Sequence, residues 1–404
     1  MTSNGNTIAE SLTPWLRSVG FQRNPFSLPF AENQPPDMFQ QTYFVADELE
    51  QLMLDQEKSV ALLAPYGGGK TAARRYTQFR WEEQYPHAFI TVYDNFTAVA
   101  EQLPNVKLST HREPLLAATA EAFWGYISKV PEKLLALPEI WQSWWWAFLY
   151  YYLPGALLEF RVHSMPGLSS SYLKYVQSGN RRRPFRRTEQ LPVILRTLSD
   201  QLKVLGFTHW FMLVDEVDGE MPHHVDAMTT LLRPLLNTLA LFRMSITWRF
   251  FLPHEVREPV NQSSARFRGQ LELADIHWRW DDLAKLLENR LLWASDGSYK
   301  SLVSLSSELT DLDKSLIDLA YWNQDVFGAP RSLLRLGESL VEQLAPNNFI
   351  TDKDWQKFLD TQQVVYLLNK ETEKLENVSR DKLLNSLMTY FSLGDLKELA
   401  YLLC

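Results

Sequence analysis

A glycine-rich stretch near residue 65 carries the clearest chemical signal in the chain. The segment from Leu62 to Arg75 reads LLAPYGGGKTAARR, with three glycines before a lysine and a threonine. Glycines let the backbone curl so that successive N–H groups point inward, and a helix that starts at the lysine adds positive partial charge. A lysine at this place reaches the β- and γ-phosphates of a nucleotide, and the threonine hydroxyl holds Mg²⁺. The stretch predicts a phosphate-binding loop; the alternative is a glycine-rich loop that binds nothing.

The predicted loop departs from the strict phosphate-loop pattern at one position. Ala64 stands where that pattern has a glycine, five residues before Gly69. We still expect nucleotide binding, because the later glycines and the Lys-Thr pair carry the cradle. Thr71 is also an expected Mg²⁺ ligand. The expected phosphate contacts come from Pro65, Tyr66, Gly67, Gly68, Gly69, Lys70 and Thr71.

A second stretch supplies the carboxylates that an ATPase needs. HWFMLVDEVDG begins at His209 and runs through apolar residues to Asp215 and Glu216. An uninterrupted apolar strand is typical of a covered parallel sheet, and its polar residues emerge at the carboxyl end, where ligands bind. We expect Asp215 to position Mg²⁺ through water and Glu216 to accept a proton from the attacking water. Asp218 is expected to be only a capping or loop carboxylate.

The elements that must position these residues alternate along the chain. Helical stretches separate the apolar strands, which indicates an α/β fold with a parallel sheet wound on both faces. In the stretch before Pro253, Thr247 is the first choice for a contact on the γ-phosphate side and Arg249 the second, with half-buried structural roles as the alternative. Besides the strand that precedes the loop and the strand at His209, we expect strands within 87–96, 242–253 and 269–278.

Together these motifs resemble the AAA+ and STAND branches of the P-loop ATPases, and are similar to bacterial origin-recognition, secretion and transposition ATPases. Two further segments carry the resemblance: GFQRNPF from Gly20 and FGAPRSLLRL from Phe327. The resemblance implies that Asn24, Pro25 and Phe26 lie near the adenine, and that Arg331 contacts the γ-phosphate from a lid helix. The alternative for the second segment is a loop with proline in a helix's first turn.

The resemblance covers roughly residues 20 to 345 and implies a domain plan. An N-terminal segment (1–40) precedes a P-loop NTPase core (41–280) that carries an insertion at about 99–187. A helical lid (281–346) and a helical extension (347–404) follow. The resemblance further implies an arginine that completes a neighbouring subunit's site, for which Arg268 and Arg266 are the candidates and ordinary surface arginines the alternative.

Composition limits the classes of function. The chain has 404 residues, a net charge of −8 and a pI near 5.6, so any affinity for nucleic acid must be local. Its single cysteine, Cys404, excludes internal disulfides and cysteine-ligated zinc.

The first residues lack a secretory signal pattern, so we expect a cytoplasmic protein. Residues 140–158 are uncharged but rich in Trp and Tyr, which favours a buried or partner-facing helix over a membrane span.

Two segments bear on partners. RRRPFRR, at Arg181–Arg187, predicts a loop that clamps nucleic-acid phosphate, or else a solvated loop or a site for an acidic partner. The segment from Ser379 to Cys404 resembles the first two helices of an effector-associated, death-like adaptor module; the alternative is a plain helical hairpin.

The sequence thus predicts an enzyme that binds ATP and Mg²⁺. The first hypothesis is a switch that hydrolyses ATP, forms homo-oligomers and signals to an effector or adaptor protein through its C-terminal helices, in prokaryotic defence. The alternative is a DNA-handling ATPase of replication or transposition. A scaffold that binds nucleotide without hydrolysis is disfavoured, because both Lys70 and Glu216 are present.

Overall fold

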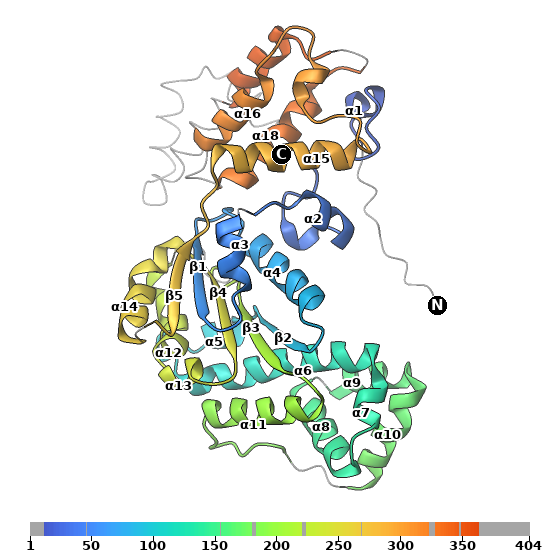
Figure 1. Cartoon of the computed structure of the whole chain (residues 1–404), viewed down its shortest axis with the longest axis vertical. Coiled ribbons are helices and arrows are strands. Elements are labelled where there is room, and N and C mark those ends of the chain that lie inside the picture. Colours follow the sequence, from blue (N-terminus) through green and yellow to red (C-terminus); the bar gives the residue numbers. More distant parts are fainter. Residues whose placement is uncertain are drawn as a thin grey trace, which may run out of the picture. The chain divides into compact units, whose positions relative to one another are not determined.

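Figure 1 shows the computed structural model of the chain. Contacts divide the chain into two compact units. One comprises residues 30–286, and the other combines residues 1–29 with 287–404. The structure describes residues 12–45, 47–153, 155–179, 183–219, 224–267, 269–322, 328–346 and 349–362.

The larger unit contains a parallel sheet of five strands. The strands are β1 (Ser59–Ala64), β2 (Ala88–Tyr93), β3 (His209–Val214), β4 (Thr247–Pro253) and β5 (Leu271–Asp275). Their order across the sheet is β2-β3-β4-β1-β5, and every pairing is parallel. All carboxyl ends therefore meet at one edge of the sheet. The prediction of an α/β fold with a parallel sheet is confirmed.

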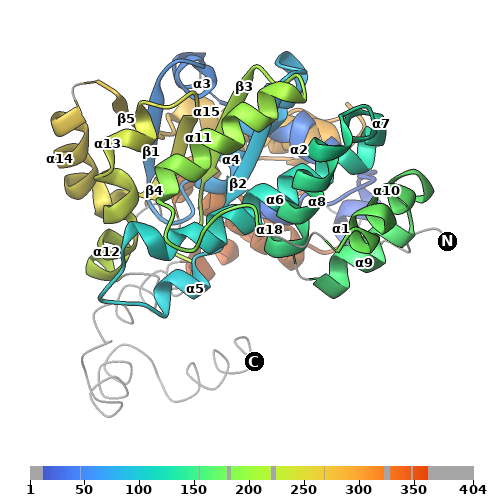
Figure 2. The same ribbon diagram turned by 90° about the horizontal axis from the view of Figure 1, so that it is seen from below.

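Helices cover both faces of this sheet, because the strand side chains are apolar in both directions. On one face, Val60 and Leu62 of β1 pack in a cluster with residues of α3 (Asp47–Leu54) and α4 (Lys70–Gln84). On the other face, Ala61 and Leu63 pack in a second cluster. Figures 1 and 2 show the helices on either side of the strands. The second cluster includes residues of α6 (Arg112–Lys129), α11 (Leu191–Val204), α12 (Val225–Leu236) and α14 (Arg257–Phe267).

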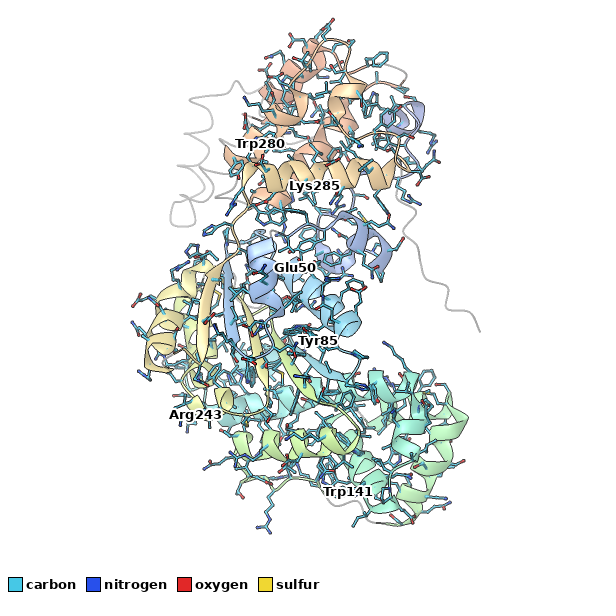
Figure 3. The ribbon with its side chains drawn as sticks, viewed as in Figure 1. Glu50, Tyr85, Trp141, Arg243, Trp280 and Lys285 are labelled. Atoms are coloured by element: carbon cyan, nitrogen blue, oxygen red, sulfur yellow. The ribbon has the colours of Figure 1, made fainter. Side chains whose placement is uncertain are left out.

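The uncharged aromatic segment forms a helix of the chain between β2 and β3. This helix, α8 (Glu139–Tyr152), has Trp145, Trp146 and Phe148 fully buried, and Trp145 stacks on Phe123 of α6 with ring centroids 3.8 Å apart. Figure 3 draws the side chains on the ribbon and labels Trp141 of this helix. Within the described ranges, no helix has the length and hydropathy to cross a bilayer. The aromatic residues instead supply the core of this helical insertion.

Short helices complete the larger unit. They are η1 (Ala31–Asn33), α2 (Pro36–Thr42), α5 (Thr97–Ala100), η2 (Leu108–His111), α7 (Pro131–Leu135), α9 (Gly155–His163), α10 (Pro166–Gln177), α13 (Leu239–Phe242) and η3 (His254–Val256).

The smaller unit is helical. Its contacts join residues 1–29 to the helices after residue 287, so the N-terminal segment expected at 1–40 divides near residue 30. The predicted C-terminal module at 379–404 lies outside the described residues. A further helical stretch occupies 352–362. The other helices are α1 (Pro14–Ser18), η4 (Leu302–Leu305), α16 (Leu312–Trp322), α18 (Ala329–Gln343) and the later part of α15 (Trp280–Ala294).

Candidate functional site

The glycine-rich loop has the backbone that its sequence predicts. It joins β1 to α4, and Gly67 and Gly69 adopt left-handed φ angles of 71° and 94°. A Cβ on Gly68 would lie 2.9 Å from Cδ of Pro65, so that position also needs glycine. Helix α4 begins at Lys70 without a side-chain cap. Its first N–H groups therefore lack the side-chain acceptor that most helix starts provide.

Lys70 is buried and held by two oxygen atoms. Its side chain is 7% exposed, and Nζ lies 3.1 Å from Oδ2 of Asp218 and donates to the Pro65 carbonyl at 3.3 Å. A buried ammonium needs a counter-ion. Asp218, expected to be only a loop carboxylate, supplies that charge and so belongs to the site.

Asp215 ends β3 at the same edge as the loop and is 1% exposed. Its Oδ2 accepts a hydrogen bond from Nε of Arg74 at 3.0 Å. Burial raises the pKa of the Asp215 carboxyl, and the Arg74 guanidinium opposes this effect. The other carboxyl oxygen, Oδ1, is buried and has no hydrogen-bond partner among the described residues. An orphaned buried carboxylate oxygen is costly and fits contact with a hydrated cation.

The described residues hold no cluster of three or more His, Cys, Asp or Glu side chains that could bind a metal by themselves. Mg²⁺ is usually held by one or two carboxylates together with water and substrate phosphates. Asp215 and the Thr71 hydroxyl, in the first turn of α4, fit that pattern as the protein's share of such a site.

Glu216 combines a strained backbone with a perturbed carboxyl group. Its φ angle of 60° lies in the left-handed region, which non-glycine residues occupy at a cost and which often marks functional sites. Burial raises the pKa of Glu216 to about 7, helped by the like charges of Asp215 and Asp94. A carboxylate with a pKa near neutrality is suited to accept a proton from water.

Thr247 and Arg249 do not lie at this edge, so the prediction that either reaches a γ-phosphate is wrong. Thr247 is the first residue of β4, at the amino edge, and its hydroxyl donates to the Gln56 carbonyl at 2.5 Å. Arg249 is fully buried and its guanidinium bonds backbone carbonyls, including that of Met53 at 2.9 Å. Both residues fasten loops instead.

Several residues at the carboxyl edge were missed as site residues. Asp94 follows β2 and lies beside the carboxylates, because the N–H of Asp215 donates to the Tyr93 carbonyl at 3.2 Å. Nε1 of Trp278 donates to the Gly68 carbonyl at 2.9 Å and so holds the glycine-rich loop directly. His254 follows β4. Only their positions could have identified these residues from the sequence, because each of them follows a strand of the parallel sheet.

A small hollow lies beside Trp278, the residue that contacts the glycine-rich loop. Tyr43, Val45 and Ile276 line it, and the rings of Tyr43 and Trp278 meet edge to face at 6.4 Å. The hollow therefore offers apolar and aromatic surface beside the loop.

The Asn-Pro-Phe segment is part of the helical unit and is buried. Oδ1 of Asn24 accepts the N–H of Phe26 at 3.0 Å, and Phe26 is 0% exposed. The Phe26 ring packs so closely on Gly337 of α18 that a Cβ there would lie 2.1 Å away. The ring is fully buried and presents no free face to a base, and the expected place of this segment near the adenine stays a prediction. Asn24 and Pro25 are buried with it.

The predicted arginine roles have mixed outcomes. Arg331 is half-buried in the first turn of α18, and its contact with a γ-phosphate stays a prediction. Arg266 is exposed, with Nη1 3.4 Å from Oδ1 of Asn237. Arg268 lies outside the described residues, as do Arg181 and Arg182.

The described part of the arginine-rich loop is only partly free. Nη2 of Arg183 lies 2.6 Å from Oε1 of Glu113, and its guanidinium also lies over the Tyr152 ring, 5.7 Å from the centroid. Arg186 and Arg187 are exposed. A phosphate clamp would therefore draw first on Arg186 and Arg187.

Comparisons with known proteins add no relatives. No protein-family model matches the chain, and no curated protein does either. The case for function therefore rests on the residues and geometry of the carboxyl edge.

Proposed function

We propose that the chain binds ATP with Mg²⁺ at the carboxyl edge of its sheet and hydrolyses it. The proposal rests on three features that lie together at this edge. The start of α4 has no side-chain cap, Oδ1 of Asp215 has no hydrogen-bond partner, and Glu216 combines a strained backbone with a pKa near neutrality. Each is costly in isolation and is relieved or used by a nucleotide triphosphate.

Each residue of the site has its own role in ATP binding or hydrolysis under this proposal. Lys70 exchanges the Asp218 carboxylate for the phosphates, and the glycine-loop N–H groups bind their oxygens. Asp215 and Thr71 orient Mg²⁺, which when bound neutralises charge on the phosphates. Glu216 accepts a proton from the attacking water.

We further propose that hydrolysis drives a switch that oligomerises and signals to an effector protein. A DNA-handling role is the less favoured reading, because Arg183 already has the Glu113 carboxylate as its partner. The two readings differ in an observable: DNA binding through the loop would weaken steeply with salt, and serine at Arg186 and Arg187 would flatten that dependence.

Two substitutions test the core of the proposal. Lys70→Ala removes the ammonium that contacts the phosphates, so we expect ATP binding to be lost. Glu216→Gln removes only the base, so binding should persist while turnover falls by about 10²-fold to 10⁴-fold. Equilibrium titration with a fluorescent ATP analogue and a phosphate-release assay measure the two effects.

A matched control is available at the opposite edge of the sheet. Lys58 is an exposed lysine paired with Glu272, and Lys58→Ala should change neither measurement. Unchanged hydrolysis in Glu216→Gln would refute its assignment as the base, and unchanged binding in Lys70→Ala would refute the site.

A further inference from the structure

The outer edge of β2 is an open strand edge. Among the described strands, β2 ends the sheet and pairs only with β3, in register from Ala88 opposite His209 to Tyr93 opposite Val214. The N–H of Asp215 bonds the Tyr93 carbonyl, which shows that Tyr93 directs its backbone groups toward β3. Backbone direction alternates along a strand. Ile90 and Val92 therefore direct their N–H and C=O groups away from the sheet, and these groups have no hydrogen-bond partner among the described residues.

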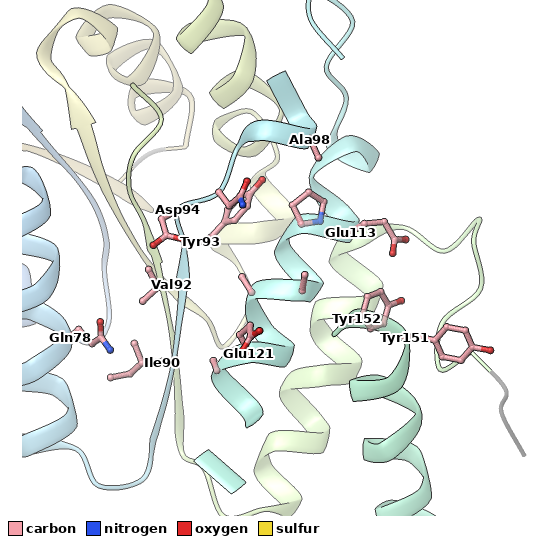
Figure 4. A pocket seen from close by; sticks show the side chains of 15 residues that line it. Gln78, Ile90, Val92, Tyr93, Asp94, Ala98, Glu113, Glu121, Tyr151 and Tyr152 are labelled. Atoms are coloured by element: carbon pink, nitrogen blue, oxygen red, sulfur yellow. The ribbon is translucent and has the colours of Figure 1, made fainter. Parts of the chain in front are cut away.

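These unpaired groups face a groove of about 650 Å³. Ile90 and Val92 line it, with Gln78 of α4 on one side and α6 on the other (Figure 4). Helix α6 leaves room because its groove side carries mostly small side chains at helical spacing: Pro114, Ala117, Ala118, Glu121 and Ala122. The groove thus exposes a strand edge between two helices.

The sequence of β2 gives this edge none of the usual protection. Its six residues, AFITVY, include no proline and no charged side chain. Natural proteins usually blunt such an edge with charges, proline or a covering segment, because it otherwise pairs with other chains. An uncovered edge of this kind is suited to accept an added strand.

The charged residues that line the groove indicate which kind of peptide would bind there. The described residues that line it include the carboxylates Asp94, Glu113 and Glu121 and no lysine or arginine. Glu113 already pairs with Arg112 and Arg183, and Glu121 pairs with Arg161. Among the described ion pairs none involves Asp94, at the carboxyl end of β2. The carboxylate that is left for a ligand therefore lies at that end of the groove.

We propose that this groove is a docking site for an extended, basic peptide segment of a partner protein, which adds as a strand along the outer edge of β2. Backbone hydrogen bonds to Ile90 and Val92 hold the peptide, and a lysine or arginine of the peptide pairs with Asp94. Asp94 lies beside the carboxylates at the end of β3, so the peptide reaches the edge of the sheet where the proposed ATP site lies. Docking itself needs neither ATP nor Mg²⁺.

The test uses a dye-labelled peptide of about seven residues that alternates lysine and valine, since β2 itself has six residues. Fluorescence anisotropy with the full chain should show saturable binding. A version methylated on every backbone nitrogen should bind about tenfold more weakly or not at all, because it has no N–H group left to pair along a strand edge. An alternating glutamate and valine peptide should not bind.

Two substitutions on α6 localise the site. Ala117→Trp fills the groove and should abolish binding, whereas Lys129→Trp adds the same side chain to an exposed position of α6 that does not line the groove and should leave binding unchanged. Asp94→Asn should weaken binding several-fold, because it removes the charge pair. Slowed amide exchange at Ile90 and Val92 in the bound state would support strand addition directly. Circular dichroism melts check that each variant remains folded.

Other outcomes overturn the proposal. Absence of saturable binding, equal binding of the methylated peptide, or full binding to Ala117→Trp would each exclude strand addition in this groove. Self-association of the chain that Ala117→Trp abolishes would identify a second copy, rather than a basic peptide, as the occupant.

Discussion

Polar side chains at the two edges of the parallel sheet differ in whether their hydrogen bonds are satisfied. At the amino edge, Arg249 and Thr247 are satisfied by backbone carbonyls of the end of α3 and of the segment that leads from it to β1. At the carboxyl edge, Asp215 keeps a buried oxygen without a partner and Glu216 sits in a strained backbone conformation. The polar residues at the first edge stabilise the fold, whereas these two residues at the second edge remain available to a ligand.

Backbone direction explains the difference. The segment before β1 turns its carbonyl oxygens toward the amino edge, where they accept hydrogen bonds from Arg249. After β1 the glycine loop leads into the start of α4, which concentrates N–H donors and positive partial charge. Donor side chains are therefore satisfied at one edge, and anions are attracted to the other.

The largest effect should come from Arg249→Leu at the amino edge. The change leaves buried carbonyls without donors, so the free energy of unfolding should fall by about 3 kcal/mol or more. Urea denaturation followed by circular dichroism measures it. Lys58→Met, which breaks only an exposed ion pair nearby, is the control and should have little effect. Wild-type stability in Arg249→Leu would show that these hydrogen bonds do not fasten the edge.

His111 is a buried polar residue behind the carboxyl edge, and both of its ring nitrogens have hydrogen-bond partners. Its Nδ1 lies 2.9 Å from the Tyr93 hydroxyl and its Nε2 lies 2.9 Å from the Leu231 carbonyl, and the ring is 0% exposed. Burial lowers the pKa of His111 from 6.5 to about 4. The unfolded chain therefore binds a proton at a pH where the folded chain does not, and stability should fall as the pH drops through this window.

The expected loss at His111 is about 3 kcal/mol between pH 6.5 and pH 4. His111→Gln does not titrate, so its unfolding free energy should depend on pH less steeply over this range. Denaturant titrations at several pH values provide the comparison. Identical slopes for the two proteins would place the pKa of the folded His111 near its ordinary value.

Asp218→Asn should tighten nucleotide binding by about tenfold, since phosphate no longer competes with a carboxylate for Lys70. Titration with a fluorescent ATP analogue measures the change. Asp226→Asn alters the net charge equally at an exposed position of α12 and should leave the affinity unchanged. Equal affinities of Asp218→Asn and the unmutated chain would indicate that the Lys70 ion pair does not oppose binding.

The smallest effect should come from Thr247→Ala. It removes one hydrogen bond to the Gln56 carbonyl, so stability should fall by about 1 kcal/mol, with ATP turnover unchanged. Phosphate release and urea denaturation of the same preparation separate the two effects. A large loss of turnover at unchanged stability would return Thr247 to the catalytic group and weaken the contrast between the edges.

The sequence by itself determined the local features of the site. Three adjacent glycines before a lysine and threonine specify a turn that only glycine fits, and the structure has left-handed φ angles at two of them. The apolar run before Asp215 likewise predicted a buried strand with its carboxylates at the end, because these features depend on neighbours in the chain. The parallel sheet followed from strands that alternate with helices.

Only the tertiary structure decided which polar residues meet. Alternation in the fourth strand made Thr247 and Arg249 plausible site residues, but β4 begins at Thr247, so strand register carried both to the far edge. The pairs of Lys70 with Asp218 and of Arg74 with Asp215 join residues about 140 or more positions apart. The open edge of β2 depends on strand order, which no local pattern encodes. Local propensity fixes elements, whereas packing between distant segments fixes which side chains are satisfied and which remain available to a ligand.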